Sequence, residues 1–179
     1  MERYHGRPAD ATGRPEKELR CYDALDALGI AYDRVDHPHA DTIDACLAIE
    51  GCLGAKICKN LFLCNRQKTE FYLLLPGDKP FQTKVFSKLI GVSRLSFADA
   101  DAMLHYLDIT PGSVSILGLM NDREKALHVY IDREVASDPW LGAHPCINTS
   151  TLRLETATVL DRFVPWTGHT ATVIDLPRE

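Results

Sequence analysis

Lys59 and Asn60 interrupt the apolar residues 57–64, which read Ile-Cys-Lys-Asn-Leu-Phe-Leu-Cys. Such a run of β-branched, aromatic and aliphatic residues is typical of a buried strand. Lysine is rarely buried without a partner, because removing its charge from water is costly. Alternation puts Lys59 on one face with Ile57, Leu61 and Leu63, opposite Asn60. The lysine is therefore predicted either to face a cleft or an anion, or to reach solvent at a strand edge.

A second group of polar side chains lies in residues 144–151. Five of these eight residues form hydrogen bonds through neutral polar groups: His144, Asn148, Thr149, Ser150 and Thr151. The run suits a neutral polar ligand such as a ribose, an amide or an ester. The alternative is a turn whose Asn, Ser and Thr side chains bind their own backbone. His144 has the residue type of a general base, but a histidine before a proline can equally be a structural hydrogen-bonder.

Between these two groups, an otherwise acidic chain contains a basic segment with Lys79, Lys84, Lys88 and Arg94. Lys84 and Lys88 are four residues apart and share a helical face. The simpler interpretation is a solvated helix surface, and the alternative is a patch that contacts phosphates.

Several classes of site are absent from the sequence. Ser113 and Ser115 lack the Gly-x-Ser-x-Gly elbow of a hydrolase, and there is no glycine-rich phosphate loop or paired histidine and carboxylate metal motif. The six cysteines include no Cys-x-x-Cys pair, which favours buried, reduced thiols over a zinc site. We therefore expect neither a cofactor nor a metal.

The length and the charge composition of the chain are those of one globular domain. The 179 residues include 20 basic and 25 acidic side chains, and the net charge of -5 argues against a chain-wide nucleic-acid-binding surface. No apolar run approaches the roughly 20 residues of a membrane span, and the N-terminus has no apolar signal region. We expect a cytoplasmic protein without membrane association, monomeric by default.

The elements that must position these residues can be read from periodicity. Residues 1–14 are predicted to be a loose segment, and residues 15–179 a single domain. Helices are predicted over residues 15–28, 43–50, 85–90, 97–107 and 156–164, and a loop over 138–145. Strands are predicted over residues 30–35, 57–64, 70–75, 113–119, 126–131, 149–154 and 171–176. Hairpins interrupted by irregularly placed helices indicate an α+β fold with a mostly antiparallel sheet.

Three ordered segments resemble the signatures of prolyl-tRNA synthetase-associated editing domains. They are residues 59–63 (KNLFL), 111–122 (PGSVSILGLMND) and 144–152 (HPCINTSTL). The likeness is to the free-standing YbaK/PrdX-type branch, the alanyl-tRNA(Pro) deacylases, and the stretch WTGH at residues 166–169 also fits. The resemblance covers residues 15–177.

This resemblance implies a trans-editing hydrolase that cleaves alanine from the 3′ end of proline tRNA. It implies an α+β fold whose mixed, mostly antiparallel sheet forms a partial barrel flanked by helices. The expected catalytic residues are Lys59, Asn60 and His144, and the expected substrate-binding residues are Asn148, Thr149, Lys84 and Lys88. The expected partner is the tRNA(Pro) acceptor end carrying alanine, with prolyl-tRNA synthetase as a second candidate. Removal of cysteine or serine, or a non-catalytic binding module of the same fold, are the alternatives.

Overall fold

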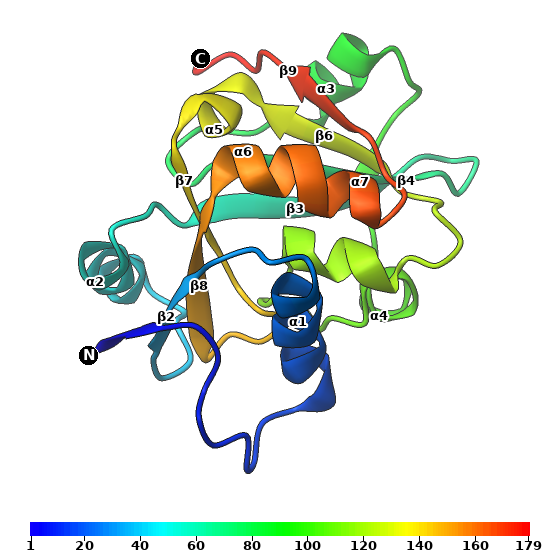
Figure 1. The fold of residues 1–179 in the computed structure, drawn as a ribbon. Helices are drawn as coiled ribbons and strands as arrows, with labels where there is room; N and C mark the ends of the chain where they lie inside the picture. Colours follow the sequence, from blue (N-terminus) through cyan, green and yellow to red (C-terminus); the bar gives the residue numbers. More distant parts are fainter.

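The computed structural model describes residues 1–179 and contains two β-sheets flanked by helices (Figure 1). The first sheet is antiparallel, with the order β1 (Arg3–His5), β2 (Asp33–Asp36), β8 (Ser150–Glu155) and β7 (Trp140–Ala143). The second has the order β5 (Ser96–Phe97), β3 (Cys58–Cys64), β4 (Glu70–Pro76), β6 (His128–Asp132) and β9 (Ala171–Ile174). In it β6 runs parallel to β4 and β9, and the other pairs are antiparallel. The predicted α+β class with a mixed, mostly antiparallel sheet is confirmed.

The two sheets meet at one place, a parallel bridge between Ile57 and Gly142. The Gly142 amide donates to the Lys56 carbonyl at 3.1 Å. A Cβ at position 142 would lie 2.8 Å from that carbonyl oxygen, so glycine permits the close approach. The sheets curve around a shared core, and no closed barrel forms.

Helices flank both sheets (Figure 1). They are α1 (Glu16–Ala27), α2 (Ile43–Leu53), α3 (Thr83–Ile90), α4 (Ala100–Leu107), α5 (Arg133–Ser137), the 3-10 helix η1 (Ile116–Asn121) and a continuous segment of α6 (Thr156–Thr158), the π-helix η2 (Val159–Phe163) and α7 (Val164–Trp166). The last segment crosses the face of β3 in Figure 1. No helix has the length and apolar composition needed to cross a membrane.

The alternation predicted for β3 is confirmed by its packing. Phe62 belongs to the main core of 26 buried residues, formed with α1, η1 and the α6–α7 segment. Leu63 belongs to a smaller core under α3, and Leu61 packs against it. Lys59 therefore extends from the α3 side of the strand, and Asn60 from the main-core side.

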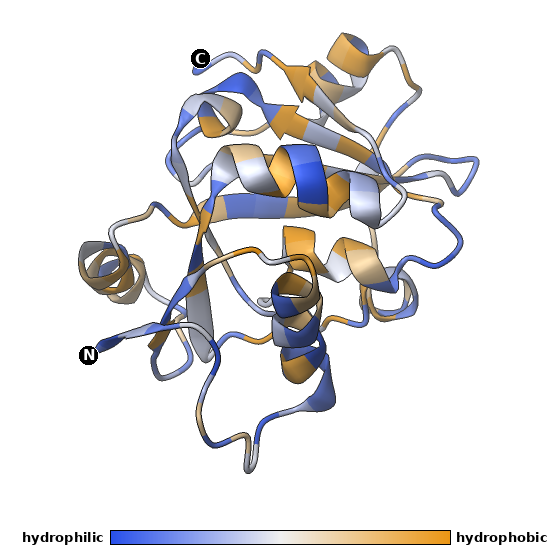
Figure 2. Ribbon diagram, in the orientation of Figure 1, coloured by the Kyte–Doolittle hydropathy of each residue, from blue (hydrophilic) through white to orange (hydrophobic).

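The start of α2 matches the helix predicted at residues 43–50, and its end lies three residues later, at Leu53. The Thr42 hydroxyl accepts a hydrogen bond from the Ala45 amide, and Gly54 ends the helix in the left-handed conformation with φ of 73°. Most of its residues are apolar, as its colour in Figure 2 shows, although Ile43 and Leu47 are exposed. This helix is the wall of a pocket that is described below.

Several predicted elements differ from the structure. Residues 113–119 are not a strand, because the Ser115 hydroxyl accepts from the Leu117 amide and starts η1. The helix expected at residues 97–107 begins at Ala100 with Asp99 as its cap, and Ser96–Phe97 instead pairs with β3.

The loop predicted at residues 138–145 contains β7, and the segment predicted to be loose at residues 1–14 contains β1, paired with β2. All six cysteines are free thiols, as expected, but only Cys21 and Cys146 are fully buried.

Candidate functional site

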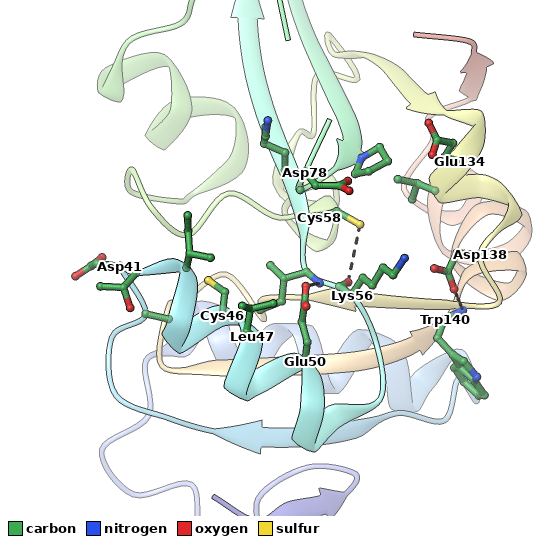
Figure 3. A pocket seen from close by; sticks show the side chains of 18 of the residues that line it. Asp41, Cys46, Leu47, Glu50, Lys56, Cys58, Asp78, Glu134, Asp138 and Trp140 are labelled. Carbon is green, nitrogen blue, oxygen red and sulfur yellow. Dashed lines mark hydrogen bonds between the residues drawn. The ribbon is translucent and has the colours of Figure 1, made fainter. Parts of the chain in front are cut away.

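A cavity of about 640 Å3 opens beside Lys59 (Figure 3). Its walls are α2, the start of β3, the turn after β4, α5 and β7, and Arg178 of the C-terminal segment. In Figure 3 Cys46, Leu47 and Glu50 extend from α2 on one side, and Glu134, Asp138 and Trp140 lie on the other. We call this cavity the Lys59 pocket. Its size is within the usual range of roughly 300–1,000 Å3 for small-molecule sites.

The Lys59 amine is partly buried and has one protein partner. Its Nζ donates to the backbone carbonyl of Lys79 at 2.6 Å. An ammonium group has three N–H donors, so two of them are left for a ligand. The sequence left a cleft-facing lysine and an edge lysine as alternatives, and the structure places Lys59 in the wall of the pocket.

The carbonyl that holds Lys59 is itself anchored by a buried ion pair. The Lys79 side chain is 2% exposed, and its Nζ lies 2.7 Å from Asp132 Oδ2, 2.5 Å from Glu134 Oε2 and 2.8 Å from the Leu176 carbonyl. Burial favours the neutral amine, but the hydrogen bonds to the two carboxylates outweigh it and raise the pKa of Lys79. Lys79 is therefore not part of a solvated basic face, which corrects that interpretation of the basic segment.

Charges of both signs line the Lys59 pocket. The acidic residues are Asp41, Glu50, Asp78, Glu134 and Asp138, and the basic ones are Lys56, Lys59 and Arg178. Arg178 lies 2.6 Å from Glu134, and hydrogen bonds from Arg178 and Lys79 lower the pKa of Glu134 to about 2. Glu134 is consequently ionised at neutral pH and unsuited to act as a general acid there.

Cys58 contributes a thiol to the same pocket. Burial raises its pKa to about 12. Because the thiolate is the nucleophilic form, Cys58 is poorly suited to covalent catalysis at neutral pH. Its contribution is to the shape and polarity of the wall.

Asn60 lies on the other face of β3, outside the Lys59 pocket. Its Nδ2 donates to the Cys58 carbonyl at 3.1 Å, and its Oδ1 accepts from the Tyr72 hydroxyl. Tyr72 is fully buried, so this bond satisfies a phenol that has no access to water. The two neighbouring polar residues of the strand thus have different surroundings.

His144 and Asn148 belong to a second, compact group. We call His37, His144, Asn148 and Thr151 the histidine cluster. Asn148 is 5% exposed and makes two hydrogen bonds of 3.3 Å with Ala40, accepting from its amide and donating to its carbonyl. These bonds continue the β2–β8 ladder, in which the His37 amide donates to the Thr149 carbonyl at 3.0 Å.

The His144 imidazole is partly buried within this cluster. Its Nδ1 lies 2.9 Å from the Ser150 carbonyl and 3.3 Å from Thr151 Oγ1. Burial lowers the pKa of His144 below its ordinary value, and nearby His37 and His39 act in the same direction. His144 is therefore the neutral imidazole at neutral pH, the form that accepts a proton.

The pocket and the cluster are joined at two places, by the Asn148 side chain and by a backbone bridge. Ala40 lines the Lys59 pocket and is held by Asn148. The bridge between Ile57 and Gly142 lies two residues before Lys59 on one strand and two residues before His144 on the other, with the strands running in the same direction. No hydrogen bond links Lys59 directly to His144.

The remaining predicted site residues lie outside both regions. The Thr149 side chain is exposed, and its carbonyl is used by His37. Lys84 and Lys88 are exposed on α3 and take part in no ion pair. Both lie at the molecular surface, away from the lining of the pocket.

Three residues of these regions, His37, Thr151 and Lys79, were not among the predicted catalytic or substrate-binding residues. His37 had a signal, since His37-Pro38 repeats the His144-Pro145 dipeptide, and Thr151 lay inside the polar run. Lys79 had none, because Asp132 and Leu176 are 53 and 97 residues away.

Known proteins resemble this chain over most of its length. Residues 37–161 match the family model of the aminoacyl-tRNA editing domain. The chain is 31% identical over 153 residues to the prolyl-tRNA editing protein ProX of Acetoanaerobium sticklandii, covering 85% of this chain and 93% of that protein. It is 28% identical over 160 residues to the prolyl-tRNA synthetase associated domain-containing protein 1 of Danio rerio, covering 88% and 85%.

The fold has a counterpart among solved structures. A crystal structure of a candidate trans-editing enzyme for prolyl tRNA synthetase superposes with a TM-score of 0.67 at 19% identity, covering 90% of this chain and 97% of that one. At this identity the likeness concerns the fold. The family match over more than two thirds of the chain, together with the 31% identical relative, shows that the chain belongs to the aminoacyl-tRNA editing domain family.

Proposed function

We propose that this protein is a trans-editing deacylase that hydrolyses the ester between alanine and the 3′ end of tRNA(Pro). The observation that carries the proposal is Lys59, whose amine has two unused donors in the wall of a cavity of about 640 Å3. The relatives named for prolyl-tRNA editing and for association with prolyl-tRNA synthetase support the choice of tRNA. The sequence resemblance supports alanine as the amino acid.

In this proposal Lys59 holds a phosphate or the ribose of the terminal adenosine. The Lys79 carbonyl fixes the Lys59 amine in place. A phosphate that binds there forms a charge-assisted hydrogen bond with the amine and acts as its counter-ion. His144 accepts a proton from the attacking water. The aminoacyl ester is intrinsically labile, so positioning and stabilisation of the oxyanion can supply the acceleration without a covalent nucleophile.

Discrimination against proline is proposed to occur by exclusion within the pocket. A packed wall that admits a methyl group disfavours a larger ring. The cavity beside Lys59 is far larger than a methyl group and fits an amino acid together with part of a nucleoside. A cavity of this volume also admits cysteine and serine, so the assay below includes both amino acids.

The body of the tRNA is proposed to meet a basic surface that includes Lys84 and Lys88. Residues 55–98 hold eight basic and two acidic side chains, a net charge of +6, whereas the rest of the chain has a net charge of -11. A hydrogen bond of 3.2 Å between Ser93 and Gln67 joins the hairpin turn to the segment after α3. Arg66, Lys68 and Arg94, all exposed, extend this surface. Phosphate contacts of this kind give salt-dependent affinity.

Two further expectations accompany the proposal. The protein acts as a monomer in the cytoplasm, where charged tRNA is used. Prolyl-tRNA synthetase stays a predicted partner through its product, the mischarged tRNA.

The test is a deacylation assay on tRNA(Pro) charged with radiolabelled alanine, proline, cysteine or serine. We expect release of alanine with proline retained, and a decrease in rate of about 100-fold or more in Lys59→Ala, the scale of removing one key electrostatic interaction. Lys17→Ala removes a lysine of α1 outside both regions and serves as the matched control. Release of cysteine or serine in place of alanine would change the substrate. If no amino acid is released faster than the spontaneous rate, the proposed enzymatic activity is contradicted and the alternative of a non-catalytic binding module remains.

A further inference from the structure

Thr151 lies between the two imidazoles of the histidine cluster. Its Oγ1 is 2.9 Å from His37 Nε2 and 3.3 Å from His144 Nδ1, and the ring centroids are 6.2 Å apart. Thr151 is fully buried, and His37 is 8% exposed. A buried hydroxyl in this position is shared by both rings and has no access to water.

The protons of this group can be assigned from its acceptors. A carbonyl oxygen only accepts, so His37 Nδ1, 2.8 Å from the Pro38 carbonyl, must carry a hydrogen. Neutral His37 then has an unprotonated Nε2, which accepts the hydrogen of the Thr151 hydroxyl. His144 Nδ1 must likewise carry a hydrogen, because its nearest partner is the Ser150 carbonyl.

These assignments give the hydrogen bonds one direction. His144 Nδ1 donates to the Ser150 carbonyl and, over a longer distance, to Thr151 Oγ1. Thr151 donates to His37, and His37 donates to the Pro38 carbonyl. We call this chain of donors the threonine relay. In this relay the Thr151 hydroxyl hydrogen is donated to His37. The lone pairs of Thr151 Oγ1 are therefore left to accept from His144.

The remaining ring nitrogen of His144 is free. Nε2 has no hydrogen-bond partner in the protein, and it is not among the buried polar atoms without a partner, so solvent reaches it. With Nδ1 protonated, the neutral ring has its lone pair on Nε2. This nitrogen is the one available to take a proton from water.

We propose that Thr151 and His37 are positioning residues that hold the His144 ring in place, with the Ser150 carbonyl fixing the Nδ1–H tautomer and Nε2 presented as the base. This role rests on the proposed deacylase function. When water attacks the ester carbonyl, Nε2 takes one of its protons. As the bond between the carbonyl carbon and the ribose oxygen breaks, the same proton passes to the ribose oxygen, which gives a free amino acid and a tRNA hydroxyl.

Charged groups near His144 are few, which makes its titration interpretable. His37 and His39 are the charged groups that act on its pKa, and the Asp36 carboxylate is engaged by the Ser150 hydroxyl at 2.5 Å and by Arg14 at 2.9 Å. A change at Thr151 that alters the pH profile therefore acts on the histidine cluster itself.

The experiment compares Thr151→Val, which keeps the shape and removes the hydroxyl, with Thr151→Ser, which keeps the hydroxyl. Thr156→Val is the matched control, because Thr156 is 1% exposed and its hydroxyl has no partner. We expect Thr151→Val to lower the deacylation kcat about tenfold at pH 7, the effect of one hydrogen bond, with KM unchanged. Thr151→Ser should restore most of the rate, and Thr156→Val should match the wild type.

The pH dependence separates positioning from a loss of folding. Thr151→Val removes an acceptor that stabilises the protonated ring, so the acid limb of its pH–rate profile should move to lower pH. Nitrogen NMR of the imidazoles should show Nδ1–H for both His37 and His144 in the wild type, and in Thr151→Val the Nδ1–H tautomer of His144 should persist while its pKa falls.

Three other outcomes would overturn the positioning role of Thr151 and His37. An Nε2–H tautomer for His144 in the wild type contradicts the relay directly, whatever the activity. A Thr151→Val rate and pH profile equal to the wild type, in an enzyme that His144→Ala inactivates, would reject the positioning role and keep the proposed function. An inactive wild type would reject both.

Discussion

The Lys59 pocket and the histidine cluster are adjacent but differ in physical character. The pocket is open, and its walls carry three basic and five acidic side chains from distant parts of the chain. The cluster is largely buried, contains no carboxylate, lysine or arginine, and is formed by two segments that continue one β-ladder. An open charged cavity suits the capture of a charged nucleotide, and a largely buried neutral environment keeps an imidazole unprotonated.

The two regions also depend on different interactions for their geometry. Lys59 is held through the buried Lys79–Asp132 ion pair, in which both side chains are at most 2% exposed. His144 is held by neutral hydrogen bonds to a carbonyl and a hydroxyl. Loss of one ion from a buried pair leaves an uncompensated charge, whereas loss of a neutral partner is less costly. The comparison therefore predicts unequal responses to substitution.

The largest effect on stability is expected for Asp132→Ala. It removes the buried partner of Lys79 and the cap on the Glu134 amide at 2.9 Å, which leaves only the half-exposed Glu134 as a counter-ion. The free energy of unfolding should fall by about 3 kcal/mol or more. Urea unfolding measures this. Asp175→Ala, which breaks an exposed pair with Arg133, is the control and should change little. Equal losses in both variants would contradict the anchoring role of the buried pair.

An intermediate effect is expected for Asn148→Ala. The substitution removes both bonds to Ala40, which lies in the pocket wall, and should cost about 1–2 kcal/mol. Because the wall loosens, KM for the aminoacylated tRNA should rise several-fold. Asn121→Ala removes a 2.7 Å bond to the Leu107 carbonyl outside both regions and should lower stability without raising KM. A KM unchanged in Asn148→Ala would show that the cluster does not shape the pocket.

The smallest effect is expected at α3. Lys84→Ala combined with Lys88→Ala should weaken tRNA binding a few-fold, because each lysine is expected to neutralise a phosphate. The slope of log affinity against log salt should become shallower by about 0.7–0.9 for each phosphate that the variant no longer binds. Filter binding at several salt concentrations measures the slope, with Lys17→Ala as the control. An unchanged slope would place the tRNA elsewhere on the molecule.

The sequence was sufficient where a local rule determines the structure. The alternation of β3 placed Lys59 with Leu61 and Leu63, and the helix predicted from residue 43 begins at Ile43, as α2 does. It was insufficient for β7, because Gly142 and the nearby Pro139 break the period of a strand that exists through its pairing with β8.

The candidate site was less predictable than the fold, because its contacts are long-range. Lys79 resembled its basic neighbours in the sequence, and only tertiary folding brings it to Asp132. The polar run at residues 144–151 indicated hydrogen bonding, but the use of Asn148 by Ala40 and of Thr151 by His37 depends on a segment more than 100 residues earlier. The spacing of residues along the chain does not indicate hydrogen-bond partners that are this far apart in the sequence.

The most direct test of the account is a double-mutant cycle on Lys59 and His144. Deacylation of alanyl-tRNA(Pro) is measured for the wild type, Lys59→Ala, His144→Ala and the double variant under single-turnover conditions. If the pocket and the cluster serve one reaction, each single variant loses most of the rate and the double variant loses less than the product of the two, as for residues that act as a unit. A His144→Ala variant with the wild-type rate would contradict the account and leave Lys59 in a site without this base.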